Sequence, residues 1–344
     1  MIIEENPTTS ARNTRKRKTH AIQEIEEESG REIMENISAT AAGASINLRT
    51  RVGPAPFVRL IKGLSEKQKT IVKKIGFGSL LHLSFDKFHG DFVKFLLENL
   101  RPISAQLKLT TGEFLDIEED DVKAVFGLPK GEKDVVEANG KNETEDYTEL
   151  LKEWRAEWGI EKGSPQTTSM IEKILQDDDD GDKFIRIFVI FTVSCLIRGN
   201  QSVNNNFKIL LSLVNVGEIK NLNWCKYTRQ SLMDAGEEWQ AYPPRMFTGP
   251  LLFLMICYFD RVQFKGQILD NVFPTIKFWT KDRIDKRVKD ERKLGFGLGK
   301  VKPRIMHVEE QTEQKGDELL TKEISFISHL HQVLEETEYV THVV

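Results

Sequence analysis

One continuous apolar stretch, residues 184–197 with the sequence FIRIFVIFTVSCLI, constrains the fold of this chain more than any other segment. A helix rises about 1.5 Å per residue, so the stretch spans roughly 21 Å, whereas the hydrocarbon core of a bilayer is about 30 Å thick. The stretch also carries a charge, Arg186. Because it is apolar on every side, we expect a buried helix surrounded by other helices rather than a membrane span.

Apolar residues recur at three- and four-residue steps through much of the remaining chain, which predicts further helices. Hydrophobic residues make up 39% of the sequence and charged residues 30%, a balance typical of globular proteins. The chain is therefore expected to be mainly α-helical. The predicted helices cover residues 65–74, 86–100, 143–158, 168–175, 184–198, 204–213, 222–235, 250–262 and 281–293.

A short β-hairpin interrupts this helical pattern. Residues 106–110 and 113–117 alternate polar and apolar side chains on either side of Thr111 and Gly112. Alternation of this kind around a glycine turn is typical of two antiparallel strands. The predicted fold class is thus mainly α with one or two small β-hairpins, in which a helical core is flanked by disordered tails.

Local signals predict where several elements begin and end. Ser65 is placed to cap a helix, and Asp116 followed by Glu119 has the spacing of a capping box for the helix that ends at Phe126. Gly127 follows this last helix, where a glycine commonly provides the left-handed C-cap. The Gly-broken apolar run at 75–83 is expected to be a strand or a tight corner.

Composition divides the chain into segments. The first 56 residues contain no Phe, Tyr or Trp, so they cannot bury enough apolar surface to offset the entropy of ordering. The predicted organisation is a disordered tail at 1–56, a helical region at 57–294, a Gly-rich and polar linker at 295–318, and an amphipathic helix at 319–344. The helical region allows two subdomains with a break near 130–165. Packing of the C-terminal helix on the core and pairing with a partner helix both remain open.

The three cysteines, Cys195, Cys225 and Cys257, are spaced about thirty residues apart. No Cys-x-x-Cys pair and no histidine at ligand spacing accompanies them, which argues against a zinc site and against a disulfide framework. Cys195 and Cys257 lie in apolar segments, where cysteine is usually a small core residue. We therefore expect a reducing compartment and no catalytic cysteine.

Other motifs resemble binding sites only in composition. A calcium loop built on the acidic run at 177–182 would begin at Gln176 and end at Ile187, and neither residue is a carboxylate ligand. A phosphate loop built on GFGLGK at 295–300 would need glycine at Leu294 and Ser or Thr at Val301. We expect no metal, no cofactor, no small-molecule substrate and no enzymatic activity. The two histidines of the last helix, His329 and His331, do not share a helix face.

A basic cluster in the N-terminal tail is typical of a nuclear localisation signal. The alternative is an incidental group of charges. The cluster predicts a nuclear protein, and it consists of Arg12, Arg15, Lys16, Arg17 and Lys18.

Residues 281–304 contain ten Lys or Arg against four Asp or Glu, within a chain whose net charge is −4. The spacings Asp282–Lys286 and Asp285–Lys289 predict ion pairs on an ordinary solvated helix. The alternative is a surface segment that contacts nucleic-acid phosphates weakly and without sequence preference. Its candidate contact residues are Arg283, Arg287, Lys293, Lys300, Lys302 and Arg304.

Six ordered segments of the sequence carry a resemblance to a known family. They are IGFGSLLHL at 75–83, FVKFLLENLRP at 92–102, LKLTTGEFLDIEEDDVKAVFGLPKG at 107–131, LNWCKYTRQSL at 222–232, GPLLFLMICYFDRV at 249–262 and WTKDRIDKRVKDERKLGFG at 279–297. In these segments the chain resembles the aminotransferase-like plant mobile domain proteins, and also the related region that precedes the peptidase in plant transposon-encoded, Ulp1-like proteins. The resemblance covers roughly residues 60–300.

The resemblance implies a transposon-derived nuclear protein linked to genome stability and to silencing of transposable elements. It implies no catalytic activity, because no context for a cofactor-bearing lysine is recognisable and no His, Asp and Cys peptidase domain is present. The expected function is a nuclear interaction protein with a nuclear protein partner. The alternative is an orphaned N-terminal targeting region of a Ulp1-like cysteine peptidase, and an enzyme with an unrecognised site is a third reading.

Overall fold

In a computed structural model of the chain, the structure describes residues 49–50, 52–176, 181–201, 205–265 and 272–304. All of these residues belong to one unit of the chain, which begins at Leu48. The predicted basic cluster, most of the acidic run at 177–182 and the predicted C-terminal helix lie outside the described residues.

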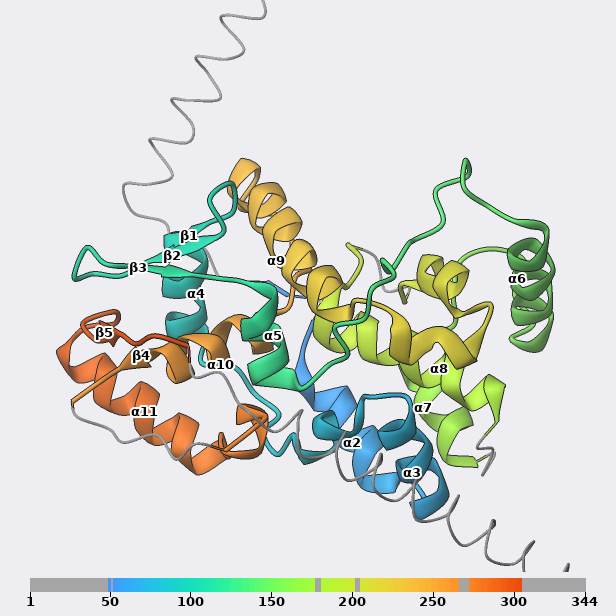
Figure 1. The fold of residues 1–344 in the computed structure, drawn as a ribbon, viewed down its shortest axis with the longest axis horizontal. Helices are drawn as coiled ribbons and strands as arrows, with labels where there is room; N and C mark the ends of the chain where they lie inside the picture. Colours follow the sequence, from blue (N-terminus) through green and yellow to red (C-terminus); the bar gives the residue numbers. More distant parts are fainter. Residues whose placement is uncertain (1–48, 51, 177–180, 202–204, 266–271, 305–344) are drawn as a thin grey trace, which may run out of the picture. The chain divides into compact units, whose positions relative to one another are not determined.

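The described chain is mainly α-helical, which confirms the predicted fold class (Figure 1). Short 3-10 turns, named η, connect several helices, and η2 is a π-helix at Val193–Ile197. The α-helices are α2 (Pro54–Gly63), α3 (Glu66–Lys74), α4 (Gly90–Asn99), α5 (Glu119–Phe126), α6 (Glu145–Glu157), α7 (Thr167–Gln176), α8 (Asp182–Thr192), α9 (Trp224–Ala241), α10 (Leu251–Arg261) and α11 (Lys281–Leu294). The 3-10 turns are η1 (Gly78–His82), η3 (Phe207–Leu213), η4 (Val216–Asn221) and η5 (Thr275–Lys277).

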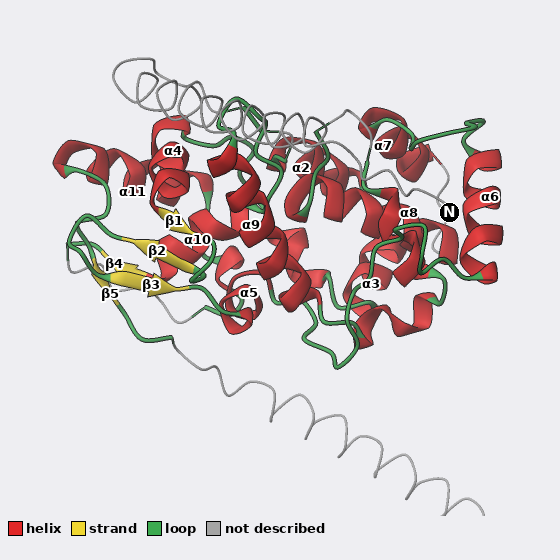
Figure 2. Cartoon of the chain, turned by 90° about the horizontal axis from the view of Figure 1, so that it is seen from above, coloured by secondary structure: helices red, strands yellow, loops and turns green. Residues whose placement is uncertain are grey.

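Two small antiparallel sheets accompany the helices (Figure 2). The predicted hairpin is confirmed as β2 (Gln106–Lys108) and β3 (Phe114–Asp116), and β1 (Leu100–Arg101) adds a third strand beside β2. The second sheet pairs β4 (Val262–Gln263) with β5 (Lys300–Val301). Because β4 directly follows α10, this pairing ties the segment after α11 to the helical core.

The helix boundaries test the predicted caps. Ser65 caps α3 together with Gln68, as expected. The cap of α5 is shifted, because Asp116 is still part of β3, so Glu118 and Asp121 form the capping box instead of Asp116 and Glu119. Gly127 ends α5 in the left-handed conformation with φ 62°, as predicted. The run at 75–83 forms a tight corner around η1.

The apolar stretch at 184–197 lies in the interior, as expected. Phe188, Val189, Ile190 and Phe191 of α8 are each 0% exposed, and Phe57 of α2 packs on Phe188 with ring centroids 6.0 Å apart. Arg186 is accommodated because its guanidinium donates hydrogen bonds to the carbonyls of Leu213 and Val214, each at 3.0 Å. None of the described helices is both long and apolar enough to cross a membrane.

The fold begins upstream of Phe57, so the boundary of the predicted disordered tail at residue 56 is wrong. Thr50 forms a β-bridge with Phe247, the Gly53 amide donates to the Cys195 carbonyl at 2.9 Å, and Val52 is 2% exposed. The segment is held by backbone hydrogen bonds, by the Thr50 hydroxyl on the Phe247 carbonyl, and by burial of Val52 and Pro54. The prediction of disorder, which was based on the absence of aromatic residues, therefore missed the burial of this segment.

Candidate functional site

Helix α11 carries most of the predicted basic segment and separates its residues into two faces. Ile284, Arg287, Val288 and Glu291 are buried, and their spacing of three and four residues places them on one side of the helix. The exposed cations Arg283, Lys286, Lys289 and Lys293 lie on the opposite side, together with Asp282. The helix therefore presents a mostly basic face to solvent while its other face is anchored in the protein.

The anchor is a buried charge network. Arg287 is 1% exposed and hydrogen bonds Glu291, which is 0% exposed. The Tyr258 hydroxyl of α10 donates to Glu291 Oε2 at 2.6 Å, and Arg287 Nη2 donates to the Val262 carbonyl at 2.7 Å. Burial, followed by the charge of Glu291, raises the pKa of the Tyr258 phenol. The expectation that Arg287 is a surface residue is thus wrong, because a buried carboxylate and a carbonyl take up its guanidinium.

The glycine-rich segment after α11 is packed against the protein. The Gly297 amide donates to the Tyr258 oxygen at 3.1 Å, and Thr110 Oγ1 of the hairpin donates to the Phe296 carbonyl at 2.7 Å. A Cβ on Gly299 would lie 2.6 Å from the backbone oxygen of Gln263. The start of the predicted Gly-rich and polar linker at residue 295 is therefore wrong, because residues 295–301 pack on the protein and their glycines allow close approach of backbone.

Two further predicted contact residues serve to hold the chain after β5. Arg304 donates to both carboxylate oxygens of Asp121, each at 2.9 Å, and to Glu118 at 2.8 Å. These hydrogen bonds raise the pKa of Arg304, and those to Asp121 have the largest effect. The backbone of Lys302 exchanges hydrogen bonds with Arg261 at 2.7 and 3.0 Å. The guanidinium of Arg304 is consequently paired with carboxylates, and only a small part of its side chain is exposed to solvent.

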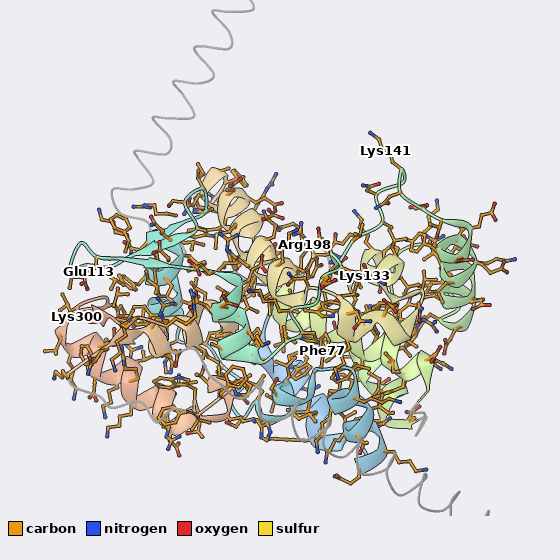
Figure 3. The ribbon with its side chains drawn as sticks, viewed as in Figure 1. Phe77, Glu113, Lys133, Lys141, Arg198 and Lys300 are labelled. Atoms are coloured by element: carbon orange, nitrogen blue, oxygen red, sulfur yellow. The ribbon has the colours of Figure 1, made fainter. Side chains whose placement is uncertain are left out.

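Arg283, Lys293 and Lys300 are exposed, as expected for surface contacts. The Arg283 guanidinium lies over the Phe278 ring at 3.9 Å and donates to the Phe278 carbonyl at 2.7 Å. Lys300 stands at the edge where β5 meets the hairpin tip, beside Glu113 (Figure 3). Lys286 and Lys289, which were not among the predicted contacts, share the exposed face of α11.

The two ion pairs predicted along α11 are not found among the described residues. Asp285 Oδ1 instead lies 2.8 Å from His89 Nε2, within hydrogen-bond distance, and Arg292 forms an ion pair with Asp91 of α4. Both interactions join α11 to the α4 region rather than one helical turn to the next. Lys286, Lys289 and Lys293 are consequently left with no carboxylate partner in the part of the chain that the structure describes.

A second polar cluster lies where the π-helix η2 ends, and sequence reasoning missed it. Arg198, the residue after η2, binds Asp234 at 2.8 Å and lies 3.5 Å from Glu137. Glu137 also accepts hydrogen bonds from Tyr227 and from Asn206, the latter at 2.7 Å. π-helices are rare and often occur at functional sites. Here the cluster fastens the loop before α6 to α9, and no sequence signal links residues so far apart.

The three cysteines are buried and free, which confirms the prediction that Cys195 and Cys257 are core residues and adds Cys225 to them. Burial raises the pKa of Cys195 to about 12. Burial is also the largest of several effects that raise the pKa of Cys225 to about 12. The pKa of Cys257 is also raised well above its ordinary value by burial. A thiol with such a pKa is almost entirely protonated at neutral pH and is a poor nucleophile.

Within the described ranges, no group of three or more His, Cys, Asp or Glu residues is arranged to hold a metal ion. The predicted nuclear localisation residues and the histidine pair at 329 and 331 fall outside those ranges. The acidic run at 177–182 is described only at Gly181 and Asp182.

Comparison with known proteins adds one result. No curated protein and no solved structure matches the chain. A family model described as "Domain of unknown function (DUF8566)" matches residues 50–255. The matched region begins at Thr50, which pairs with Phe247, includes the three-stranded sheet and η2, and ends within α10. The chain therefore belongs to the DUF8566 family.

Proposed function

We propose that this protein is a non-catalytic nuclear interaction protein that contacts nucleic-acid phosphates through the exposed face of α11. The contact is weak and sequence-indifferent, because lysine and arginine side chains on phosphates fix position without reading bases. A nuclear protein partner is part of the same proposal.

The observation that supports it is the opposition of the two faces of α11. Arg287 and Glu291 neutralise each other on the buried face, so the local positive charge is concentrated on the exposed one. Lys286, Lys289 and Lys293 lie at three- and four-residue steps there, and none of them forms an ion pair within the described residues. Three cations at this spacing suit consecutive phosphates along a strand. Lys300 extends the surface beyond the end of the helix.

The absence of a catalytic cysteine, which is part of the proposal, is supported by the state of the thiols. A cysteine peptidase needs a low-pKa thiolate beside a histidine, whereas burial raises the pKa of Cys195 and Cys225 to about 12. The alternative function, an orphaned N-terminal targeting region of a Ulp1-like cysteine peptidase, also predicts that the chain has no peptidase activity. Purified protein should leave a ubiquitin-like modifier precursor uncleaved, and turnover that is lost on replacing one of the three cysteines would contradict both proposals.

The nuclear part of the proposal is supported by the basic cluster and by the resemblance to the plant mobile domain proteins. A link to transposon silencing or genome stability follows from that resemblance alone. Replacing Arg15, Lys16, Arg17 and Lys18 together by Ala should abolish nuclear accumulation of the tagged chain. Unchanged accumulation would reject the import role of the cluster.

The phosphate contact is tested by the salt dependence of duplex DNA binding. Each neutralised phosphate contributes about −0.9 to the slope of log K against log salt, so three or four contacts give a slope of roughly −3. The triple variant Lys286→Gln, Lys289→Gln and Lys293→Gln should reduce the magnitude of the slope by about 2.7, leaving only the contribution of Lys300. Fluorescence anisotropy with a labelled duplex at several salt concentrations measures this slope.

A matched control removes the same net charge elsewhere. Lys62, Lys67 and Lys74 are exposed residues of the α2 and α3 region, and their triple replacement by Gln should leave the slope unchanged. Equal slopes in the two triple variants would show that net charge, rather than α11, governs binding. Absence of binding by the wild-type chain even at low salt would reject the proposed function.

A further inference from the structure

The three-stranded sheet next to α11 has two distinct faces. The strand register aligns Leu100, Leu107 and Leu115 across the sheet, and each of these leucines is 0% exposed. Successive side chains of a strand point to opposite faces, so the residues between them form the outer face. The register therefore separates a buried leucine layer from a face directed to solvent.

The outer face combines cations with an aromatic ring. Arg101 of β1 and Lys108 of β2 are exposed, and Lys108 lies directly across from Phe114 of β3. Phe114 is 48% exposed, although it belongs to a strand with a buried leucine layer beneath it. The acidic Asp116 on this face accepts a hydrogen bond from Gln106 Nε2 at 2.7 Å and keeps its negative charge, so the two cations exceed the anions of the three strands by one. Lys108 has no carboxylate partner among the described residues.

The hairpin of this sheet lies next to the segment that follows α11. The tip of the hairpin contacts the segment after α11 through Thr110 on the Phe296 carbonyl, at 2.7 Å. The Val301 amide donates to Glu113 Oε2 at 3.2 Å, which places Lys300 next to the strand that carries Phe114. Figure 3 shows Glu113 and Lys300 beside each other at this junction.

We propose that the outer face of the β1–β2–β3 sheet binds single-stranded nucleic acid by stacking one base on Phe114, while Lys108 and Arg101 contact the flanking phosphates. The proposal rests on the proposed function and deepens it by naming the form of nucleic acid. An open aromatic ring beside cations is the arrangement with which proteins bind single strands. In a duplex the bases are already stacked on one another and have no free face for such a ring.

The chemistry of the surface also sets its limits. Phe114 is the only aromatic residue in the three strands, so one base is expected to stack and no sequence preference follows. Stacking uses the ring face that every base has, whether the sugar is ribose or deoxyribose. Binding must therefore be measured with both single-stranded DNA and single-stranded RNA to identify which of the two the protein binds.

The decisive experiment measures binding of the full chain to labelled oligo(dT), oligo(rU) and duplex DNA, each about 20 nucleotides long. Phe114→Ala should weaken binding of at least one single strand by roughly 5- to 150-fold, which is the range reported for loss of one stacked base, and should leave duplex affinity unchanged. Phe114→Trp should keep the single-strand affinity, whereas Phe114→Leu should lose it, because leucine keeps apolar area and lacks a π face.

Failure of this inference can be told apart from failure of the proposed function. If the α11 triple variant weakens both duplex and single-strand binding while Phe114→Ala changes neither single strand, the stacking platform is rejected and the α11 proposal stands. If Phe114→Ala weakens only single strands and the α11 variant has no effect, the sheet proposal stands alone. Equal losses on duplex and single strands in Phe114→Ala would overturn the stacking role. Thermal melting of each variant verifies that the fold is intact.

Discussion

Arg287 and Glu291 hydrogen bond to each other one turn apart on α11, and both side chains face the interior of the protein. The pair receives further support from Tyr258 and from the Val262 carbonyl. Because this pair sets the rotation of α11 about its axis, it also decides which lysines reach solvent. A buried interaction therefore shapes the surface on which the proposed function depends.

Breaking this pair should cost stability. Glu291→Ala leaves the Arg287 guanidinium buried without its carboxylate, and loss of one partner of a buried ion pair typically costs about 3–5 kcal/mol. Lys289→Ala on the exposed face of the same helix should change the free energy of unfolding by less than about 0.5 kcal/mol. Urea unfolding of both variants measures the difference, and similar values for the two would show that the pair does not anchor α11.

Asp260 should make stability depend on pH. Burial, opposed by Arg261 and Lys302 and assisted by Asp121, raises the pKa of Asp260 to about 6 from an ordinary value of 3.8. A folded-state pKa above the unfolded value means that the folded protein binds the proton more tightly. The contribution of Asp260 is therefore most favourable below about pH 4, falls as pH rises to about 6, and stays unfavourable above that.

Asp260→Asn removes this titration. The variant should be more stable than the wild type at pH 7.5 by up to about 3 kcal/mol, and the advantage should shrink to near zero at about pH 4. Unfolding by urea at several pH values measures it. An advantage that does not change with pH would contradict the proposed environment of Asp260.

The three cysteines should be unreactive in the folded protein. Cys195, Cys225 and Cys257 are buried, and the raised pKa of each leaves a negligible thiolate fraction at pH 8. A water-soluble disulfide reagent should label none of them under native conditions and all three in denaturant. Rapid labelling of any one in the native protein would place that thiol at the surface.

Truncations should locate the true start of the fold. Removal of residues 1–48 should change the melting temperature little, because that segment lacks aromatic core residues. Extending the deletion through residue 56 removes Val52, the bridge from Thr50 to Phe247 and the first turn of α2. Burial of a valine alone is worth roughly 1.5–3 kcal/mol, so the longer deletion should be destabilised by at least that much. Equal melting temperatures for the two truncations would restore the boundary at Phe57.

Some elements were predictable because their cause is local. The buried helix α8 follows from an apolar run that can be stable only in a core, and the β2–β3 hairpin follows from alternation around Gly112. The left-handed cap at Gly127 likewise depends on one residue and its immediate neighbours. The cap of α5 was misplaced because two acidic pairs share the same spacing, and only the end of β3 decides between them.

The amino-acid sequence by itself determined the helical class, the hairpin and the core positions of Cys195 and Cys257, since periodicity and apolar content act over a few residues. Only the tertiary structure decided the fate of the charged residues in the basic segment. Arg287 is buried because α10 brings Tyr258 to its partner Glu291, and Arg304 is occupied because Asp121 lies beside it from 183 positions away in the chain. Whether a charge is a surface contact or an internal fastening depends on which distant groups the fold places next to it, and a linear pattern contains no such distance.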